Sequence, residues 1–221
     1  MSDYLSQRRY VREYDTEYDI SLSTFHDMIY RAWRVTPSKN QYMPYKVHVL
    51  GKQHKKEKQS IYQLCLESEG KLDGRTTDEL YDERYNKRLP AYSNILSCSY
   101  LLIFTLRVED KPNNWQKGRI NRGHKDQQLS QEGLLEMEEA ITLEVGLFAD
   151  ALSNYCLEKD IDVSFTGCFP RNVNQWKDFP YVDNKPLLLM TVGKGKVYQD
   201  TNPENKRPDF DRIVNFVGSN L

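Results

Sequence analysis

One segment constrains the fold more than any other: residues 131–159 are predicted to form a long helix with a wide apolar face. Apolar side chains recur there at steps of three and four residues: Leu134, Met137, Ile141, Val145, Phe148, Leu152 and Tyr155. A second apolar stripe runs beside the first and consists of Ala140, Leu147 and Ala151. Such a broad apolar surface is typical of a helix that is buried on more than one side. We therefore expect other elements to pack around this helix.

Acidic side chains on the same helix raise the question of a metal centre. They are Glu132, Glu136, Glu138, Glu139 and Glu144. No Glu-x-x-His pair accompanies them, so we interpret them as a solvated face. The four histidines show no ligand spacing with one another or with a cysteine, and no metal site is expected. The four cysteines lie far apart without a Cys-x-x-Cys pair, which favours reduced, mostly buried thiols: Cys65, Cys98, Cys156 and Cys168.

Shorter periodic segments predict the elements that surround the helix. Ser21 or Ser23 caps a helix over residues 21–35, and Pro37 stops it because proline disfavours helical geometry in the residue before it. A second helix is predicted over residues 53–67. Apolar runs bounded by polar residues or glycine predict strands at 45–50, 100–106, 161–165 and 186–192.

The balance of charge narrows the range of functions. The 221 residues carry 31 Lys and Arg against 32 Asp and Glu, a formal net charge of −1, whereas general nucleic-acid binders show a basic excess. The basic run at 54–58 is interpreted as a solvated helical turn, because Glu57 interrupts it and no aromatic residue is interleaved. With 38% hydrophobic residues, the chain is expected to fold as a single domain over 1–221.

Long apolar segments are missing from the sequence. No apolar run approaches the roughly 20 residues of a membrane-spanning helix, and residues 1–14 show no apolar core of a signal peptide. We therefore expect no membrane partner and a cytoplasmic location. The polar segment 110–130 is long for a connection in a compact domain and is predicted to be a lid or substrate loop. Trp115 within it is expected either to stack on an aromatic substrate or to pack against the fold.

Several segments, taken in chain order, resemble the FMN-dependent nitroreductase-like family. Residues 8–14 resemble its Arg-Arg/His-Ser-x-Arg-x-Phe start, and residues 36–45 resemble its Ala-Pro-Ser-x-x-Asn-x-Gln-Pro-Trp loop before a strand. The long helix followed by residues 165–169 resembles the central helix and the glycine turn that lies against the flavin. Residues 187–193 and 206–208 resemble the closing strand and the basic tail. Together these matches touch most of the chain.

The resemblance implies an architecture. The expected fold is α+β, a nitroreductase-like three-layer sandwich in which helices flank a mixed central β-sheet. The resemblance also implies an intertwined homodimer, with the long helix at the interface and residues 203–221 packing on the partner subunit. The apolar character of this tail fits that expectation, because it would be an exposed patch on a monomer.

The same resemblance assigns residues to the binding of FMN. Arg8 and Arg207 are expected to hold the phosphate, assisted by Lys206, since guanidinium groups bind phosphate oxygens bidentately. Arg9 would reach the flavin ring or ribityl chain, where a cation stabilises the reduced anionic flavin. Tyr10 occupies the place where the family usually has serine, so a phenol replaces one phosphate-binding hydroxyl. Without the resemblance, these arginines are interpreted equally well as surface charges at the start of a helix.

Two further groups complete the predicted cofactor-binding set: Pro37, Ser38, Asn40, Gln41, Phe165, Thr166 and Gly167. Ser38, Asn40 and Gln41 would contact the ring or ribityl chain from the other subunit. Asn40 falls one position early relative to the family pattern, and Gln41 takes the usual asparagine place. Thr166 and Gly167 would place a backbone N–H at flavin N5, because glycine allows close approach. Without the resemblance, both groups are interpreted as an ordinary loop and turn.

These expectations together predict an FMN-dependent oxidoreductase. NADPH or NADH would deliver hydride to flavin N5, and reduced flavin would pass it in ping-pong fashion to a small acceptor such as a nitroaromatic or a quinone. No catalytic side chain is predicted, because the chemistry takes place on the cofactor. The alternative is a non-catalytic flavin- or partner-binding protein on the nitroreductase fold, which the departures at Tyr10 and Asn40 favour. A nucleic-acid-binding domain using 54–58 and 117–125 fits the balanced charge less well.

Overall fold

A four-stranded antiparallel sheet forms the centre of the computed structural model, which describes residues 9–73, 81–82, 89–90, 92–108, 111–125 and 129–198. The strand order is β2-β5-β7-β6, and every neighbouring pair is antiparallel. The strands are β2 (Tyr45–Leu50), β5 (Tyr100–Leu106), β6 (Asp162–Thr166) and β7 (Pro186–Gly193). All four were predicted, with β6 displaced by one residue and β7 longer by one.

The inner strand β5 is buried on both faces, which explains its unbroken apolar sequence. All seven of its residues are buried. Leu102 and Phe104 belong to the core on one face of the sheet, and Leu101 and Ile103 belong to the core on the other. This division follows from the alternation of side chains along a strand. The sheet therefore separates two hydrophobic cores.

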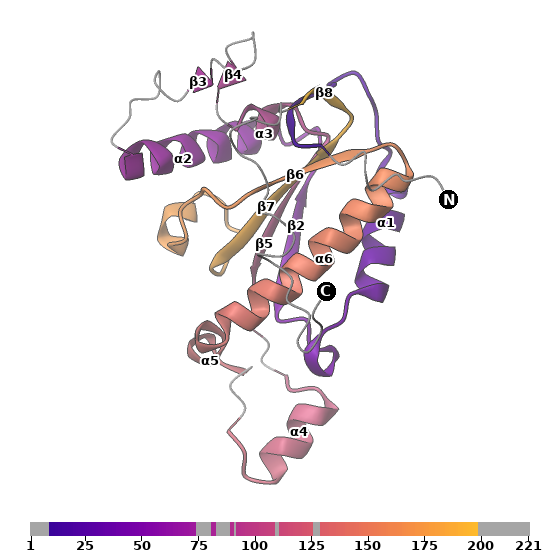
Figure 1. The fold of residues 1–221 in the computed structure, drawn as a ribbon. Coiled ribbons are helices and arrows are strands. Elements are labelled where there is room, and N and C mark those ends of the chain that lie inside the picture. Colours follow the sequence, from indigo (N-terminus) through magenta and orange to yellow (C-terminus); the bar gives the residue numbers. More distant parts are fainter. Residues whose placement is uncertain are drawn as a thin grey trace, which may run out of the picture.

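Helices cover both faces of the sheet (Figure 1). α1 and α6 pack against each other over one core. α2 and α3 cover the opposite face, together with the segment 169–182, whose Trp176 is fully buried. The bounds of these helices are α1 (Leu22–Val35), α2 (Lys55–Asp73), α3 (Ser93–Ser97) and α6 (Glu138–Glu158). The three-layer α+β arrangement predicted from the sequence is confirmed.

A second, two-stranded sheet joins the two ends of the described chain. β1 (Val11–Tyr14) runs antiparallel to β8 (Gly195–Tyr198). Tyr14 is buried, and its hydroxyl donates a hydrogen bond to the carbonyl oxygen of Thr191 at 2.9 Å. A Cβ on Gly193 would lie 2.7 Å from the Tyr14 ring, so glycine permits this close packing. The position of the N-terminal segment is thereby fixed against β7.

The predicted helix over 131–159 is in fact two helices. α5 (Gln131–Glu136) ends just before α6 begins, and Met137 between them has φ −101° and ψ 9°. The chain turns at this residue, which the continuous apolar period did not indicate. The polar segment 110–130 contains a helix that was not predicted, α4 (Asn114–Asn121), which starts with a reciprocal capping box between Asn113 and Gln116.

The remaining differences are small. α1 is capped by Ser21, whose Oγ accepts a hydrogen bond from Thr24 N at 3.1 Å. The second predicted helix, 53–67, begins two residues later and extends to Asp73. The short elements are η2 (Lys39–Gln41), β3 (Tyr81–Asp82), β4 (Leu89–Pro90) and η6 (Val173–Trp176). Within the described ranges, no helix is both long and apolar enough to cross a bilayer, and no three His, Cys, Asp or Glu side chains are grouped as metal ligands.

Candidate functional site

The predicted site residues fall into two groups at the same end of the central sheet. Strand register places Tyr45, at the start of β2, beside Leu106, at the end of β5. At the opposite edge, Thr166, at the end of β6, pairs with Leu189 near the start of β7. Three strand spacings separate these edges, a distance of about 14 Å. One chain therefore presents two separate half-sites, one at each edge of its sheet.

The first half-site is the loop of residues 36–44, between α1 and β2. Ser38 Oγ accepts a hydrogen bond from Met43 N at 2.8 Å, and Arg107 Nε donates to Met43 O at 2.8 Å. Three of its residues have positive φ, a region that side chains rarely allow: Asn40 (57°), Gln41 (55°) and Met43 (47°). Such conformations persist where the surrounding structure enforces them and are common at binding sites.

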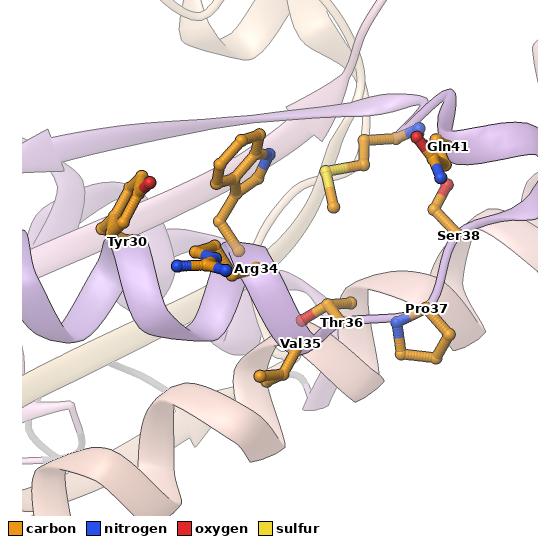
Figure 2. Close-up of a pocket in the computed structure, with 9 residues that line it drawn as sticks. Tyr30, Arg34, Val35, Thr36, Pro37, Ser38 and Gln41 are labelled. Atoms are coloured by element: carbon orange, nitrogen blue, oxygen red, sulfur yellow. Dashed lines mark hydrogen bonds between the residues drawn. The ribbon is translucent and has the colours of Figure 1, made fainter.

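A cavity of about 870 Å³ lies between this loop and the last turns of α1 (Figure 2). Aromatic, basic and polar side chains line it: Tyr30, Trp33, Arg34, Val35, Thr36, Pro37, Ser38, Gln41 and Met43. Tyr30 and Trp33 are 47% and 49% exposed, and their ring centroids lie 5.5 Å apart. Three predicted residues, Pro37, Ser38 and Gln41, thus line one cavity, whereas residues 9–10 and 165–167 do not.

Buried polar atoms without partners surround the same loop. Asn40 Nδ2, Tyr45 Oη and Glu144 Oε2 have no hydrogen-bond partner in the described part of the chain. The other Glu144 oxygen accepts a hydrogen bond from Lys39 N at 3.0 Å, which places this carboxylate at the loop. Burial raises the pKa of Tyr45, and the Glu144 charge raises it further. Because buried polar groups are almost always paired in native proteins, these atoms indicate a polar partner outside the described chain.

The second half-site joins the start of the described chain to the end of β6. Ser164 Oγ accepts a hydrogen bond from Val11 N at 2.9 Å and donates one to Val11 O at 3.1 Å. The Tyr10 hydroxyl donates to the carbonyl oxygen of Phe165. Burial raises the pKa of Tyr10, while the charge of Arg12 acts in the opposite direction. The N-terminal segment and the predicted glycine turn therefore lie side by side.

Of the two arginines in this region, Arg171 contacts the glycine turn, whereas Arg9 lies over the ring of Tyr198, whose hydroxyl donates to Asp162 at the start of β6. The guanidinium carbon of Arg9 lies 3.6 Å from the ring centroid of Tyr198. Arg171 donates to Gly167 O through Nη2 at 3.5 Å and to Pro186 O through Nη1 at 3.4 Å. Gly167 is exposed, and a Cβ on it would meet nothing nearer than the Arg171 guanidinium at 3.7 Å. Within the described residues, the approach to this turn is therefore open.

Some predicted residues lie outside the described residues, and other site residues were not predicted. Arg8, Lys206 and Arg207 are outside the described residues, as is the tail 203–221. The residues that sequence reasoning missed are Tyr45, Arg107, Glu144 and Arg171. A signal for one of them was present, since Glu144 is the only charged residue in the mostly apolar run 141–148. The interpretation of the acidic residues as a solvated face is wrong for Glu144, which has a buried carboxylate oxygen.

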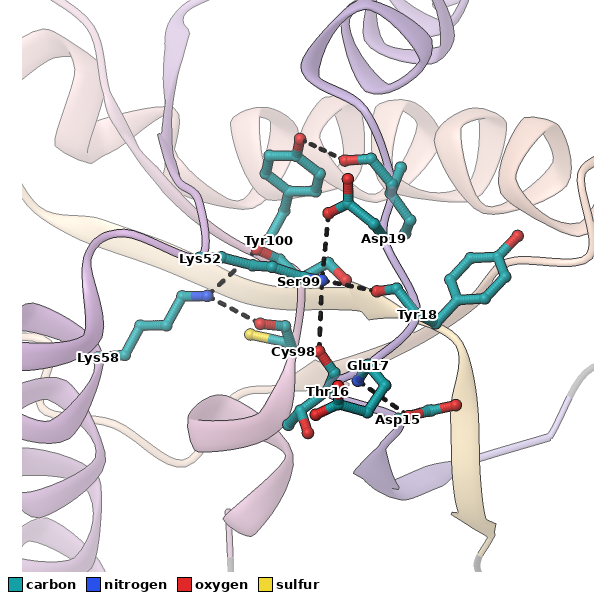
Figure 3. Close-up of polar contacts among 11 residues, drawn as sticks. Asp15, Thr16, Glu17, Tyr18, Asp19, Lys52, Lys58, Cys98, Ser99 and Tyr100 are labelled. Carbon is teal, nitrogen blue, oxygen red and sulfur yellow. Dashed lines mark hydrogen bonds and ion pairs between the residues drawn. The ribbon is translucent and has the colours of Figure 1, made fainter.

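The opposite end of the sheet carries a polar network that was not predicted (Figure 3). Lys52, which follows β2, lies 3.2 Å from the Asp19 carboxylate. Lys58 of α2 is only 2% exposed and donates to the carbonyl oxygens of Cys98 and Ser99 at 2.8 and 3.2 Å. The interpretation of the basic run in α2 as a solvated turn is therefore wrong for this lysine. Its ammonium instead caps the carbonyl end of α3.

The fold is a three-layer α+β sandwich, and a strained polar loop and a glycine turn lie at one end of its sheet. The chain belongs to the nitroreductase family, because the model of that family matches residues 5–194. The resemblance inferred from the sequence is therefore confirmed. No significant match is found among curated protein sequences.

Solved structures show the same fold at low sequence identity. A nitroreductase-like protein from Streptococcus mutans is 18% identical, with a TM-score of 0.64, over 97% of this chain and 96% of that chain. A candidate NAD(P)H:FMN oxidoreductase from Staphylococcus epidermidis is 18% identical, with a TM-score of 0.63, over 98% and 97%. A candidate nitroreductase from Exiguobacterium sibiricum in complex with FMN is 15% identical, with a TM-score of 0.63, over 97% and 95%.

Proposed function

We propose that the protein is an FMN-dependent oxidoreductase that takes hydride from NADPH or NADH and passes it to a small acceptor such as a nitroaromatic or a quinone. The observation that carries this proposal is the docking of residues 10–11 on residues 164–165, which brings together two segments that the resemblance assigns to flavin binding. Membership of the nitroreductase family supports it. The likeness to a solved structure that contains FMN agrees with it.

The residues present fit a flavin mononucleotide. Asn40 Nδ2 and Glu144 Oε2 are an unpartnered donor and an unpartnered acceptor, which suits ribityl hydroxyls because a hydroxyl both accepts and donates. Arg171 supplies a cation at the turn, and Arg8, Arg9 and Arg207 are proposed to add the charges that bind the flavin and its phosphate. The exposed backbone at Gly167 leaves room for a planar ring. When bound, FMN would supply the centre that accepts and donates hydride.

A second copy of the chain would complete the site. The two half-sites of one chain lie at opposite edges of the sheet, about 14 Å apart. Leu143 and Leu147, one turn apart on α6, are 67% and 41% exposed, whereas the opposite side of α6 is buried in the core. Exposed apolar side chains grouped in this way mark an interaction surface. We therefore place the loop 36–44 of one subunit opposite the turn 165–167 of its partner.

The side chains then have positioning roles. Ser164 and Tyr10 hold the N-terminal segment against β6. Arg107 holds the 36–44 loop in its strained form from the carbonyl side. The exposed rings of Tyr30 and Trp33 at the cavity suit a planar aromatic acceptor. None of these groups needs to exchange a proton for the proposed hydride transfer.

An absorbance experiment tests the proposal. The purified protein, incubated with FMN and desalted, should retain flavin bands that NADPH or NADH bleaches without oxygen and a nitroaromatic or quinone restores. Arg9→Gln should weaken FMN binding, because the family resemblance assigns this cation to the flavin. Lys159→Gln, at an exposed position after α6 and far from both half-sites, is the matched control. A colourless protein that ignores added FMN would favour the non-catalytic alternative instead.

A further inference from the structure

The α4 lobe, defined as residues 111–125, is attached at the candidate-site end of the sheet. The chain leaves β5 at Arg107, whose backbone N donates to Pro44 O at 3.1 Å. This hydrogen bond places the segment that follows β5 beside the 36–44 loop. Figure 1 shows α4 standing beyond that end of the sheet, past α5 and the start of α6. Gln116 of α4 is fully buried and forms the capping box with Asn113, whereas Trp115 remains 38% exposed. The lobe therefore adds a surface to the site without belonging to either core.

The lobe is basic throughout. It contains no acidic residue and five basic ones: Lys111, Lys117, Arg119, Arg122 and Lys125. None of these forms an ion pair with another residue in the described ranges. Glu109, Asp110 and Asp126 flank the lobe in the sequence and lie outside the described residues. Unpaired cations grouped in this way produce a positive potential that attracts an anion.

The lobe also carries an aromatic surface. The guanidinium carbon of Arg119 lies 4.8 Å from the Trp115 ring centroid, and the indole is partly open to solvent. Guanidinium groups hold phosphate oxygens with two parallel hydrogen bonds, and an exposed indole offers a face for a flat heterocycle. Lys117 and Arg122, both exposed, add further cations on the same helix. A phosphorylated adenosine has both groups that this surface could bind: a flat ring for the indole and an anion for the basic side chains.

We propose that the α4 lobe binds the phosphorylated adenosine end of the reductant, and that the enzyme therefore uses NADPH in preference to NADH. This inference rests on the proposed function. The nicotinamide must reach the flavin at the end of the sheet, while an extended dinucleotide carries its adenosine phosphate far from the nicotinamide. A lobe that projects from the same end meets that phosphate. NADPH carries an additional 2′-phosphate on the adenosine ribose that NADH lacks, so the charge of the lobe distinguishes the two reductants.

Single-turnover reduction of the FMN-loaded protein without oxygen tests the proposal and excludes effects of the acceptor. The second-order rate constant for NADPH should exceed that for NADH by about tenfold or more, as expected from one added charge-assisted hydrogen bond. The double variant Lys117→Gln/Arg122→Gln should bring the two constants to within about threefold of each other by lowering the NADPH constant. Lys159→Gln should leave their ratio unchanged. Added salt should lower the rate constant for NADPH more steeply than that for NADH.

Several outcomes would overturn the proposal. Equal constants for the two reductants in the unmodified protein would do so, as would a parallel loss of both in the double variant. An effect of the double variant confined to reoxidation by an acceptor would assign the lobe to the acceptor instead. If neither nucleotide reduces bound FMN, the proposed function fails as well. If both reduce it equally well, only the role of the lobe fails.

Discussion

Asn40 combines a conformational and a chemical requirement in one residue. Its backbone has φ 57° and ψ 23°, a left-handed conformation that costs most side chains roughly 1–2 kcal/mol and glycine almost nothing. Asn40→Ala should therefore lower the free energy of unfolding by about 1 kcal/mol, while Asn40→Gly should leave it near that of the unmodified protein. Both variants lack Nδ2 and should bind FMN less tightly. Urea unfolding and fluorescence titration with FMN measure the two effects.

The paired variants separate backbone from side chain at this position. Equal FMN affinity in Asn40→Gly and the unmodified protein would contradict a ligand role for Nδ2, whatever the stability of the variant. A loss of affinity in Asn40→Ala alone would assign the effect to backbone strain. Weakened binding in both, with different stabilities, is the expected result.

The cysteines should differ sharply in reactivity. Cys98 is 3% exposed, and burial raises its pKa to about 11; burial also raises the pKa of Cys156. Cys65 is buried as well, whereas Cys168 is exposed beside the glycine turn. Because the thiolate is the reactive form, an aromatic disulfide reagent at neutral pH should titrate one fast thiol in the native protein. Cys168→Ser should abolish the fast phase, and a fast phase that persists in this variant would contradict the assignment.

At the scale of elements, the strands that could be predicted are those whose pattern of apolar residues reflects burial on one or both faces of the sheet. β2 and β5 were predicted to the residue, because an alternating run and a continuous apolar run distinguish a half-buried strand from a fully buried one. β1 and β8 were missed because they carry charged residues such as Arg12, Glu13 and Lys196. Their pairing depends on backbone hydrogen bonds and on the Tyr14 ring, which no local pattern displays. The break at Met137 was missed because the apolar period continues through it.

One hydroxyl of β6 ties β1 to the edge of the central sheet. Ser164 is 1% exposed and bonds both backbone groups of Val11. Ser164→Ala leaves these groups without that partner and should lower the free energy of unfolding by about 1–3 kcal/mol. FMN affinity should fall as well, because the N-terminal segment is no longer held against β6. Chemical denaturation and flavin titration measure the two changes.

Thr142→Ala, at an exposed hydroxyl position on α6, is the matched control and should leave stability and FMN affinity unchanged. A loss of stability in Ser164→Ala with unchanged FMN affinity would show that β1 supports the fold without positioning the ligand. Early proteolytic cleavage near the N-terminus of Ser164→Ala would indicate that β1 detaches before the rest of the chain unfolds.

At the scale of the whole molecule, the candidate site shows what a sequence conveys and what it does not. Pro37, Ser38 and Gln41 are consecutive or nearly so, and a linear pattern was enough to group them. Glu144 and Arg171 come from distant segments, and only the folded chain brings them to the same end of the sheet. The resemblance implied that residues 38–41 serve the other subunit, but only the folded chain shows that the two half-sites lie at opposite edges of the sheet. This separation is the feature that most directly calls for a second subunit.

In the proposed dimer, the association of the subunits and the binding of flavin are coupled. Leu143→Lys/Leu147→Lys places two cations on the exposed apolar face of α6 and should convert the protein to a monomer in sedimentation velocity. FMN affinity should fall with it, because each site would lose the 36–44 loop of the partner subunit. By linkage, FMN should in turn tighten the dimer of the unmodified protein. Leu96→Lys, at a 40% exposed leucine on α3 in the opposite layer, should leave the dimer intact. An unmodified protein that sediments as a monomer while fully loaded with FMN would contradict the shared site, because one chain would then hold the cofactor with the partner's half-site absent.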